Sequence, residues 1–259
     1  MNLPLGNPFE TDPGAPQQTM PMRFSELTDT GRKRAGNQDR VLSDPALGLW
    51  VVADGMGGHA GGAEASRIAC QALHEAVRHD MPLADGFEVA HSAVRSAQHD
   101  QPALQGMGST LVAMREQRDG FLIAWVGDSR VYRYNAQDSG IECLSRDQNV
   151  AGQLVADGQI TVEQARNHPQ RHVLTDCIGQ RGRLPTIESR AFEWHPGDRL
   201  LLCSDGLHGE LSDDEIGQWL GAIRSPQDAT QKLLNRALEA GGRDNISLII
   251  IDAPGPPPG

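Results

Sequence analysis

Five aspartates lie at the boundaries of short apolar runs, and they are the side chains whose spacing could do chemistry. They are Asp39, Asp54, Asp128, Asp205 and Asp244. Asp54 follows the run LWVVA and Asp205 follows LLLCS, and a glycine comes next in both cases. Asp128 follows FLIAWVG, and Asp244 directly precedes NISLIII. Because strand ends can converge at one rim of a sheet, these carboxylates could gather in one site.

Gathered carboxylates point to bound cations. Like charges at close range raise each other's pKa unless cations offset them, and ligands that are all oxygen favour hard ions such as Mg²⁺ or Mn²⁺. Gly55 would let a backbone carbonyl turn towards such an ion, because glycine accepts unusual dihedral angles. An Asp-Gly pair is also a common turn. Residue types and spacing alone therefore indicate a metal site but leave ordinary turns open.

Short apolar runs predict the strands that must position these aspartates. Their length and β-branched content are typical of buried strands, and they lie at 49–53, 121–126, 200–203 and 246–251. Helical periodicity predicts helices over 65–77 and, with a less regular pattern, over 87–97. Ser225 before Pro226 predicts the start of a third helix, and Ser212 with Glu215 forms a capping box before a fourth.

Composition limits the class of protein. The chain has 259 residues, 38% of them hydrophobic, and a net charge of −11. We therefore expect one globular domain and no nucleic-acid partner, whose phosphates would be repelled. The four cysteines include no C-x-x-C pair, and no apolar run reaches about 18 residues. We expect a cytoplasmic monomer without a membrane span, with disordered tails rich in Pro and Gly at 1–21 and 254–259.

Eight segments, in order, resemble the metal-dependent protein phosphatase family (PPM, type 2C), in particular its compact bacterial serine/threonine members. They are GRKRAGNQD (31–39), VVADGMGGHAGG (51–62), GST (108–110), VGDSRVYRY (126–134), LVADGQIT (154–161), HPQRHVLTDCIG (168–179), GDRLLLCSDGL (197–207) and GGRDNIS (241–247). Each is weak alone, but the ordered series is highly specific. The resemblance implies a phosphatase domain at 22–253 with an α+β fold, a four-layer sandwich of two mainly antiparallel β-sheets flanked by helices.

The resemblance also implies a set of metal ligands. They are Asp39, Asp54, the carbonyl of Gly55, Asp128, Asp205 and Asp244. Asp54 would bridge two ions of Mn²⁺ or Mg²⁺, and Asp205 with Asp244 would complete the shell of one of them. Asp39 would hold the second ion, directly or through its waters. Asp128, with Asp205, would serve a third and looser metal position.

The implied reaction is hydrolysis of phosphoserine and phosphothreonine in other proteins. A hydroxide bridging the two ions, with Asp54 as their shared ligand, would attack phosphorus directly and without a covalent intermediate. Arg34, five residues before Asp39, matches the family's phosphate-binding arginine. His59 matches the histidine proposed as general acid. Phosphorylated proteins are the expected substrates, and a serine/threonine kinase is the expected counterpart.

Some of these residues have plainer interpretations. Arg34 lies in a short basic run that could be only a solvated face, and His59 could be an exposed loop histidine. Gln38 stands where many relatives have glutamate, which predicts weaker binding of the second metal. The segment GST is more typical of a structural role, and 168–179 resembles a mobile flap beside the site.

Other classes of protein fit the motifs less well. Cys177 and Arg183 have the C-x5-R spacing of a cysteine phosphatase, but no histidine stands directly before the cysteine. His168 and His172 lack the glutamate of a zinc hydrolase, and Pro169 opposes a helix there. The loop GMGGHAGG lacks the Lys-Ser/Thr end of a nucleotide-binding loop. A catalytically dead family member acting as a scaffold is the alternative from a different class.

Overall fold

The computed structural model describes residues 22–58, 61–118, 120–193 and 195–253. The tails predicted at 1–21 and 254–259 and the general acid predicted at His59 lie outside the described residues. Within them, the strands form two β-sheets in which every pair of neighbouring strands is antiparallel.

The strands of each sheet come from both halves of the chain. Sheet A has, in spatial order, β1 (Phe24–Asp29), β11 (Ile246–Asp252), β10 (Arg199–Cys203), β7 (Arg130–Asn135) and β8 (Gly140–Cys143). Sheet B has β2 (Asp39–Asp44), β3 (Leu49–Met56), β5 (Leu111–Gln117), β6 (Gly120–Val126) and β9 (Glu188–Glu193), and β4 (Gly108–Ser109) pairs with β3. The chain crosses from sheet B to sheet A between β6 and β7.

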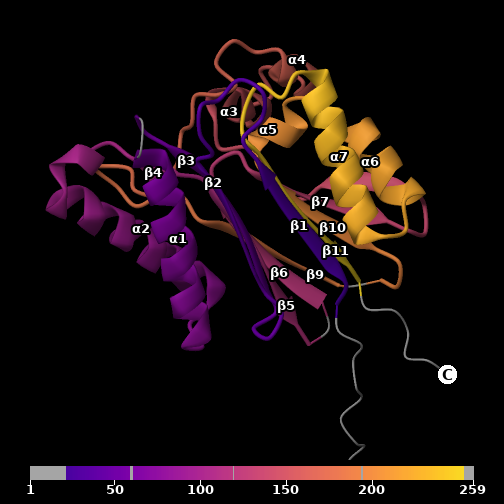
Figure 1. Ribbon diagram of the computed structural model, residues 1–259, viewed down its shortest axis with the longest axis horizontal. Helices are drawn as coiled ribbons and strands as arrows, with labels where there is room; N and C mark the ends of the chain where they lie inside the picture. The colour runs from indigo at the N-terminus through magenta and orange to yellow at the C-terminus, as the bar shows by residue number, and fades with distance from the viewer. Residues whose placement is uncertain (1–21, 59–60, 119, 194, 254–259) are drawn as a thin grey trace, which may run out of the picture.

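The longer helices lie on the outer sides of the two sheets (Figure 1). Sheet B is covered by α1 (Gly61–Arg78) and α2 (Leu83–Asp100), and sheet A by α6 (Asp213–Ala222) and α7 (Pro226–Ala240). The shorter α3 (Val150–Ala156), α4 (Val162–Arg166) and α5 (Asp205–His208) gather near one end of the strands. This arrangement confirms the expected four-layer α+β sandwich. None of the helices in the described ranges is long and apolar enough to span a membrane.

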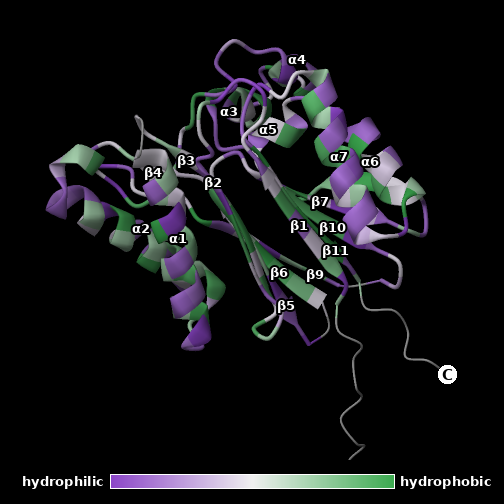
Figure 2. Cartoon of the chain, viewed as in Figure 1, coloured by the Kyte–Doolittle hydropathy of each residue, from purple (hydrophilic) through white to green (hydrophobic). Residues whose placement is uncertain are grey.

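The strands β3, β6, β10 and β11 are buried on both faces, which explains why their sequences are apolar without alternation. Figure 2 shows the hydrophobic residues gathered in the strands between the helical layers. In β3, Leu49, Val51 and Ala53 pack under α1 and α2. Trp50 and Val52 point the other way, into the layer between the two sheets. Continuous apolar strands are also typical of parallel sheets covered by helices. The sequence pattern therefore predicted buried strands but could not decide their direction.

The predicted elements are present, and the helices extend further than their apolar periodicity. The predicted strands correspond to β3, β6, β10 and β11. Helix α1 begins four residues before the predicted position because Gly61 and Gly62 fit closely against the strand ends. A Cβ atom at Gly62 would come within 2.7 Å of the Gln38 side chain. Ser225 caps α7, and the Ser212–Glu215 capping box begins α6, as predicted.

Candidate metal centre and active site

Antiparallel pairing brings the five aspartates to one end of the sandwich. Asp39 begins β2 and lies opposite Asp54, near the end of β3. Asp205 follows β10 and Asp244 precedes β11, and these two strands are also neighbours. Asp128 lies on the short connection through which the chain passes from β6 in sheet B to β7 in sheet A. Each sheet thus contributes two carboxylates, and the crossing contributes the fifth.

Burial and mutual repulsion raise the pKa of three of these carboxyl groups. The pKa of Asp54 is raised well above its ordinary value by burial and by the charges of the other four aspartates. Burial raises the pKa of Asp39 to about 7, although a hydrogen bond from Ser204 opposes the shift. Burial and the charge of Asp205 raise the pKa of Asp128 well above its ordinary value. The cluster therefore favours bound protons or bound cations.

Asp205 shows how closely the carboxylates approach one another. It is near enough to Asp54 for a hydrogen bond between the two carboxyl groups, which requires a proton on one of them. Burial favours the neutral form of Asp205, but His172 and His208 hold its pKa below its ordinary value. Asp205 is therefore the carboxylate of this pair that keeps its negative charge.

Two carboxylate oxygens of this cluster have no hydrogen-bond donor. Oδ1 of Asp39 and Oδ1 of Asp205 are buried without a partner among the described residues. An unsatisfied buried oxygen of this kind is costly unless an ion binds it. The donor set is entirely oxygen, which suits Mg²⁺ or Mn²⁺. The residues present therefore fit the metal that the family motifs imply.

Basic side chains, an arginine and a histidine, lie against two of the aspartates. Arg34 donates to both oxygens of Asp244, from Nε to Oδ1 at 2.7 Å and from Nη2 to Oδ2 at 2.6 Å. Nδ1 of His172 lies 3.5 Å from Oδ2 of Asp205. As the side chains lie in the described part of the chain, no group of three or more His, Cys, Asp or Glu residues is arranged to hold a metal ion. The hydrogen bonds to Asp244 raise the pKa of Arg34.

A cavity of about 910 Å³ opens at this end of the sandwich. Most of the predicted site residues line it: Arg34, Asp54, Gly55, Asp128, Asp205 and Asp244. Asp39 is buried behind this wall, with 5% of its surface exposed. Gln38 also lines the cavity, and its backbone N–H donates to Oδ1 of Asn245 at 2.8 Å. The structure thus brings together every predicted site residue that lies within the described ranges.

The segment GST, expected to be structural, holds the backbone of Asp54. The N–H of Asp54 donates to Oγ1 of Thr110 at 2.9 Å, and the N–H of Thr110 donates to the carbonyl of Asp54 at 2.8 Å. The Ser109 hydroxyl donates to the same carbonyl at 3.0 Å. Thr110 also shares a hydrogen bond with Ser129, beside Asp128. These contacts place the Asp54 carboxylate relative to the crossing between the sheets.

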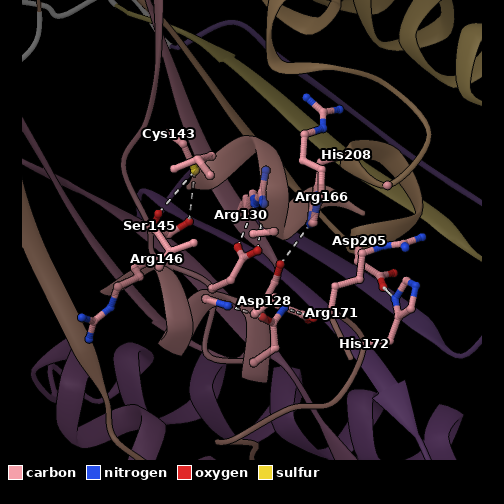
Figure 3. A pocket seen from close by; sticks show the side chains of 18 of the residues that line it. Asp128, Arg130, Cys143, Ser145, Arg146, Arg166, Arg171, His172, Asp205 and His208 are labelled. Atoms are coloured by element: carbon pink, nitrogen blue, oxygen red, sulfur yellow. Dashed lines mark hydrogen bonds and ion pairs between the residues drawn. The ribbon is translucent and has the colours of Figure 1, made fainter. Parts of the chain in front are cut away.

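Four residues that contact the aspartates were not predicted as site residues. The Ser204 hydroxyl donates to Oδ2 of Asp39 at 2.7 Å, and Nδ2 of Asn149 donates to Oδ2 of Asp128 at 3.1 Å. Nε2 of His208 lies 3.0 Å from the carbonyl oxygen of Asp128 (Figure 3). The fourth is His172. Ser204 could have been found from its place beside Asp205, whereas the histidines and Asn149 carry no local signal.

The structure also argues against a cysteine phosphatase and against a zinc hydrolase. Burial raises the pKa of Cys177, so its thiol stays protonated and is a poor nucleophile. Arg183 is bound to Asp176 at 2.7 Å and does not form a phosphate cradle with that cysteine. His168 and His172 follow the end of α4 and lie in no helix, unlike a helical zinc-binding pair.

Comparisons with known proteins agree with this geometry. The family model described as "Protein phosphatase 2C" matches residues 30–241. The serine/threonine protein phosphatase PstP of Mycobacterium tuberculosis is 34% identical over 243 residues, which cover 90% of this chain and 45% of that protein. A putative 2C-type phosphatase of Streptococcus pyogenes is 34% identical over 242 residues, covering 89% of this chain and 97% of that protein.

A solved structure shares the fold. The catalytic domain of PstP, solved in complex with two manganese ions, superposes with a TM-score of 0.77 and 32% identity, covering 89% of this chain and 97% of that one. The chain spans less than half the length of the mycobacterial PstP sequence and nearly all of the streptococcal one. With its motifs, its fold and the family model in agreement, the chain belongs to the protein phosphatase 2C (PPM) family.

Proposed function

We propose that this protein is a metal-dependent phosphatase that hydrolyses phosphoserine and phosphothreonine in other proteins. One observation carries the proposal: five carboxylates from two sheets and their crossing meet at one cavity, with raised pKa values at Asp39, Asp54 and Asp128. Such a cluster is costly unless cations bind there. Family membership and a relative solved with two manganese ions support the same function.

Six groups would hold the cations. They are the carboxylates of Asp39, Asp54, Asp128, Asp205 and Asp244 and the carbonyl of Gly55. We propose two ions of Mn²⁺ or Mg²⁺, with Asp54 shared between them and Asp128 with Asp205 serving a third, looser position. When bound, the cations would lower the pKa of water and offset the charge of the phosphate. Gln38 carries no charge, and we expect binding of the second ion to be weaker than with glutamate.

Arg34 is the residue proposed to bind the phosphate. Its guanidinium lies at the cavity with 55% of the side chain exposed, and its planar fork already binds the carboxylate of Asp244 through two hydrogen bonds. The same fork fits two phosphoryl oxygens. Once Asp244 is taken by a cation, Arg34 is free to turn to the substrate. His59 remains the proposed general acid, and direct attack by water leaves no covalent intermediate.

The cellular setting follows from the same proposal. Phosphorylated proteins would be the substrates, and a serine/threonine kinase would supply them. We further propose a cytoplasmic monomer in which 22–253 is the phosphatase domain. Phosphoproteomics of a deletion strain tests the substrate class, because serine and threonine phosphorylation should rise on specific proteins. Unchanged phosphorylation would count against it.

The reaction itself can be tested with p-nitrophenyl phosphate and a phosphothreonine peptide, each with Mn²⁺ and with EDTA. We expect turnover that needs Mn²⁺, is abolished by EDTA and is absent in Asp205→Ala. No Mn²⁺-dependent turnover by the folded wild-type chain would favour a phosphoprotein-binding scaffold instead. Gln38→Glu should bind Mn²⁺ more tightly, and an unchanged metal dependence would refute the role given to Gln38.

A further inference from the structure

His172 lies on the segment 168–179, called the flap here, and it contacts a carboxylate of the candidate metal centre. Its Nδ1 is 3.5 Å from Oδ2 of Asp205, and 59% of the histidine side chain is exposed against 18% of the aspartate. Figure 3 shows the two side chains facing each other. The flap is therefore tied to the site by a side chain that no part of the proposed reaction uses.

His172 stands between two cavities. The active-site cavity of about 910 Å³ lies on one side, and a second cavity of about 280 Å³ lies between the flap, α3, α4 and the end of β8 on the other. Asp128, Arg171, His172 and Asp205 line both. A movement of His172 would thus change the wall of the active site and the support of the flap together.

The rest of the flap is anchored independently of His172. Asn149 caps α3, forms a β-bridge with Leu174 and donates to Asp128. The N–H of Thr175 donates to the carbonyl of Gln148 at 2.9 Å. Loss of the His172–Asp205 contact would therefore leave the flap attached through these bonds and through the N–H of Val150, which donates to the carbonyl of Val173 at 2.9 Å. Only the turn at 170–172 would be released.

A cation that takes both oxygens of Asp205 must compete with His172 for one of them. Its Oδ1 is buried and has no hydrogen-bond partner among the described residues, and its Oδ2 is the atom that faces the imidazole. A cation and the imidazole attract the same carboxylate, so each weakens the binding of the other.

We propose that His172 is a positioning residue that competes with the divalent cation for Asp205, lowers the affinity of the site for that cation and couples cation binding to release of the flap. This inference rests on the proposed function for one point only, the assignment of Asp205 as a metal ligand. The competing possibility is that His172 is itself a ligand through Nδ1. The two possibilities predict opposite effects of removing the imidazole.

Calorimetric titration of Mn²⁺ into the metal-free wild type, His172→Ala and His168→Ala at one pH and ionic strength decides between them. His168 is the matched control, because it lies on the same flap and accepts a hydrogen bond from the N–H of Gln170. His168 is not among the described residues that line either cavity. We expect His172→Ala to bind Mn²⁺ roughly two- to five-fold more tightly, the factor that corresponds to one partly exposed polar contact, and His168→Ala to match the wild type.

Unchanged or weaker binding in His172→Ala would overturn the inference, because neither result is consistent with competition for Asp205. Damage to the fold would weaken Mn²⁺ binding. The tighter binding that we expect therefore cannot be an effect of such damage. If the wild type binds Mn²⁺ but the variants do not differ, only this inference fails. If the wild type does not bind Mn²⁺ at all, the proposed function fails with it.

Hydrogen exchange of the flap amides gives a second readout that does not depend on activity. Mn²⁺ should speed exchange around 170–172 in the wild type, whereas His172→Ala should exchange fast with or without Mn²⁺. Amides of α7 provide the internal reference. Slower exchange of the wild-type flap on addition of Mn²⁺ would contradict the proposed competition.

Discussion

Asp128 and Arg130 are two residues apart in the chain, yet they belong to two clusters with opposite electrostatic balance. Arg130 donates to both oxygens of Asp147 at 2.8 Å, and the two side chains are each 17% exposed (Figure 3 shows Arg130). Arg130 also donates to the hydroxyl of Tyr132, which in turn donates to Asp213. We call these four residues the balanced cluster. We call Asp39, Asp54 and Asp128 the metal-centre cluster, and no arginine or lysine among the described residues forms an ion pair with any of them.

The pKa values of the two clusters differ in direction for this reason. Burial favours the neutral form of Asp147, but the charge and hydrogen bonds of Arg130 hold its pKa below the ordinary value. Burial and like charges raise the pKa of Asp54 well above it. Similar burial thus gives opposite results, and the difference is the neighbouring cation. The balanced cluster supports the fold, whereas the metal-centre cluster keeps an excess of negative charge that cations from solution can neutralise.

The largest effect on activity is expected when one negative charge is removed from the metal-centre cluster. Asp54→Asn removes the carboxylate shared between the proposed ions and should lower kcat/KM on a phosphothreonine peptide by on the order of 10³-fold, about 4 kcal/mol. In EDTA the variant should be at least as stable as the wild type, because a repelling charge is gone. Thermal unfolding and steady-state kinetics measure the two. Activity within tenfold of the wild type would contradict the role of Asp54.

The opposite pattern is expected in the balanced cluster. Asp147→Asn leaves Arg130 without its charged partner and should lower the free energy of unfolding by about 2–4 kcal/mol. Mn²⁺ affinity of the folded fraction should stay within about twofold. Urea unfolding gives the first quantity and calorimetry the second. Asp138→Asn, on an exposed turn, is the matched control, and equal destabilisation by both would remove the distinction between the clusters.

The two clusters should also respond to pH in opposite directions. The pKa of Asp39 is about 7 in the folded chain and ordinarily 3.8. Between these values the folded state alone keeps the proton, so stability of the metal-free protein should fall as pH rises through this window, by a few kcal/mol. The pKa of Asp147 is lowered, so its contribution is lost as pH falls. Urea unfolding in EDTA from pH 4 to 8 tests this. Saturating Mn²⁺ should abolish the loss above pH 5.

A change in the cavity wall that leaves both clusters intact should have the smallest effect. Cys177 lines the active-site cavity, and burial raises the pKa of its thiol. Cys177→Ser keeps the size of the side chain and should leave kcat/KM within about twofold. Asp205→Ala in the same assay is the reference for full loss. A large loss in Cys177→Ser would revive the cysteine chemistry that the sequence suggested.

Local sequence patterns were enough to predict the strands, the helix starts and the residue types of the site. Continuous apolar runs predicted β3, β6, β10 and β11, and side-chain caps predicted where α6 and α7 begin. These features depend on neighbours within a few residues. The aspartates could be selected because each adjoins such a run. Their possible roles came from the ordered motifs, which carry family information and not geometry.

The folded chain was needed to see which strand ends meet and which side chains then reach the aspartates. Both faces of the central strands are buried, so their apolar pattern could not distinguish antiparallel from parallel pairing. Ser204 reaches Asp39 across 165 positions of the chain. His172 reaches Asp205 because the flap folds back over the site. Such contacts arise from packing between distant segments, and no local pattern in the sequence encodes them.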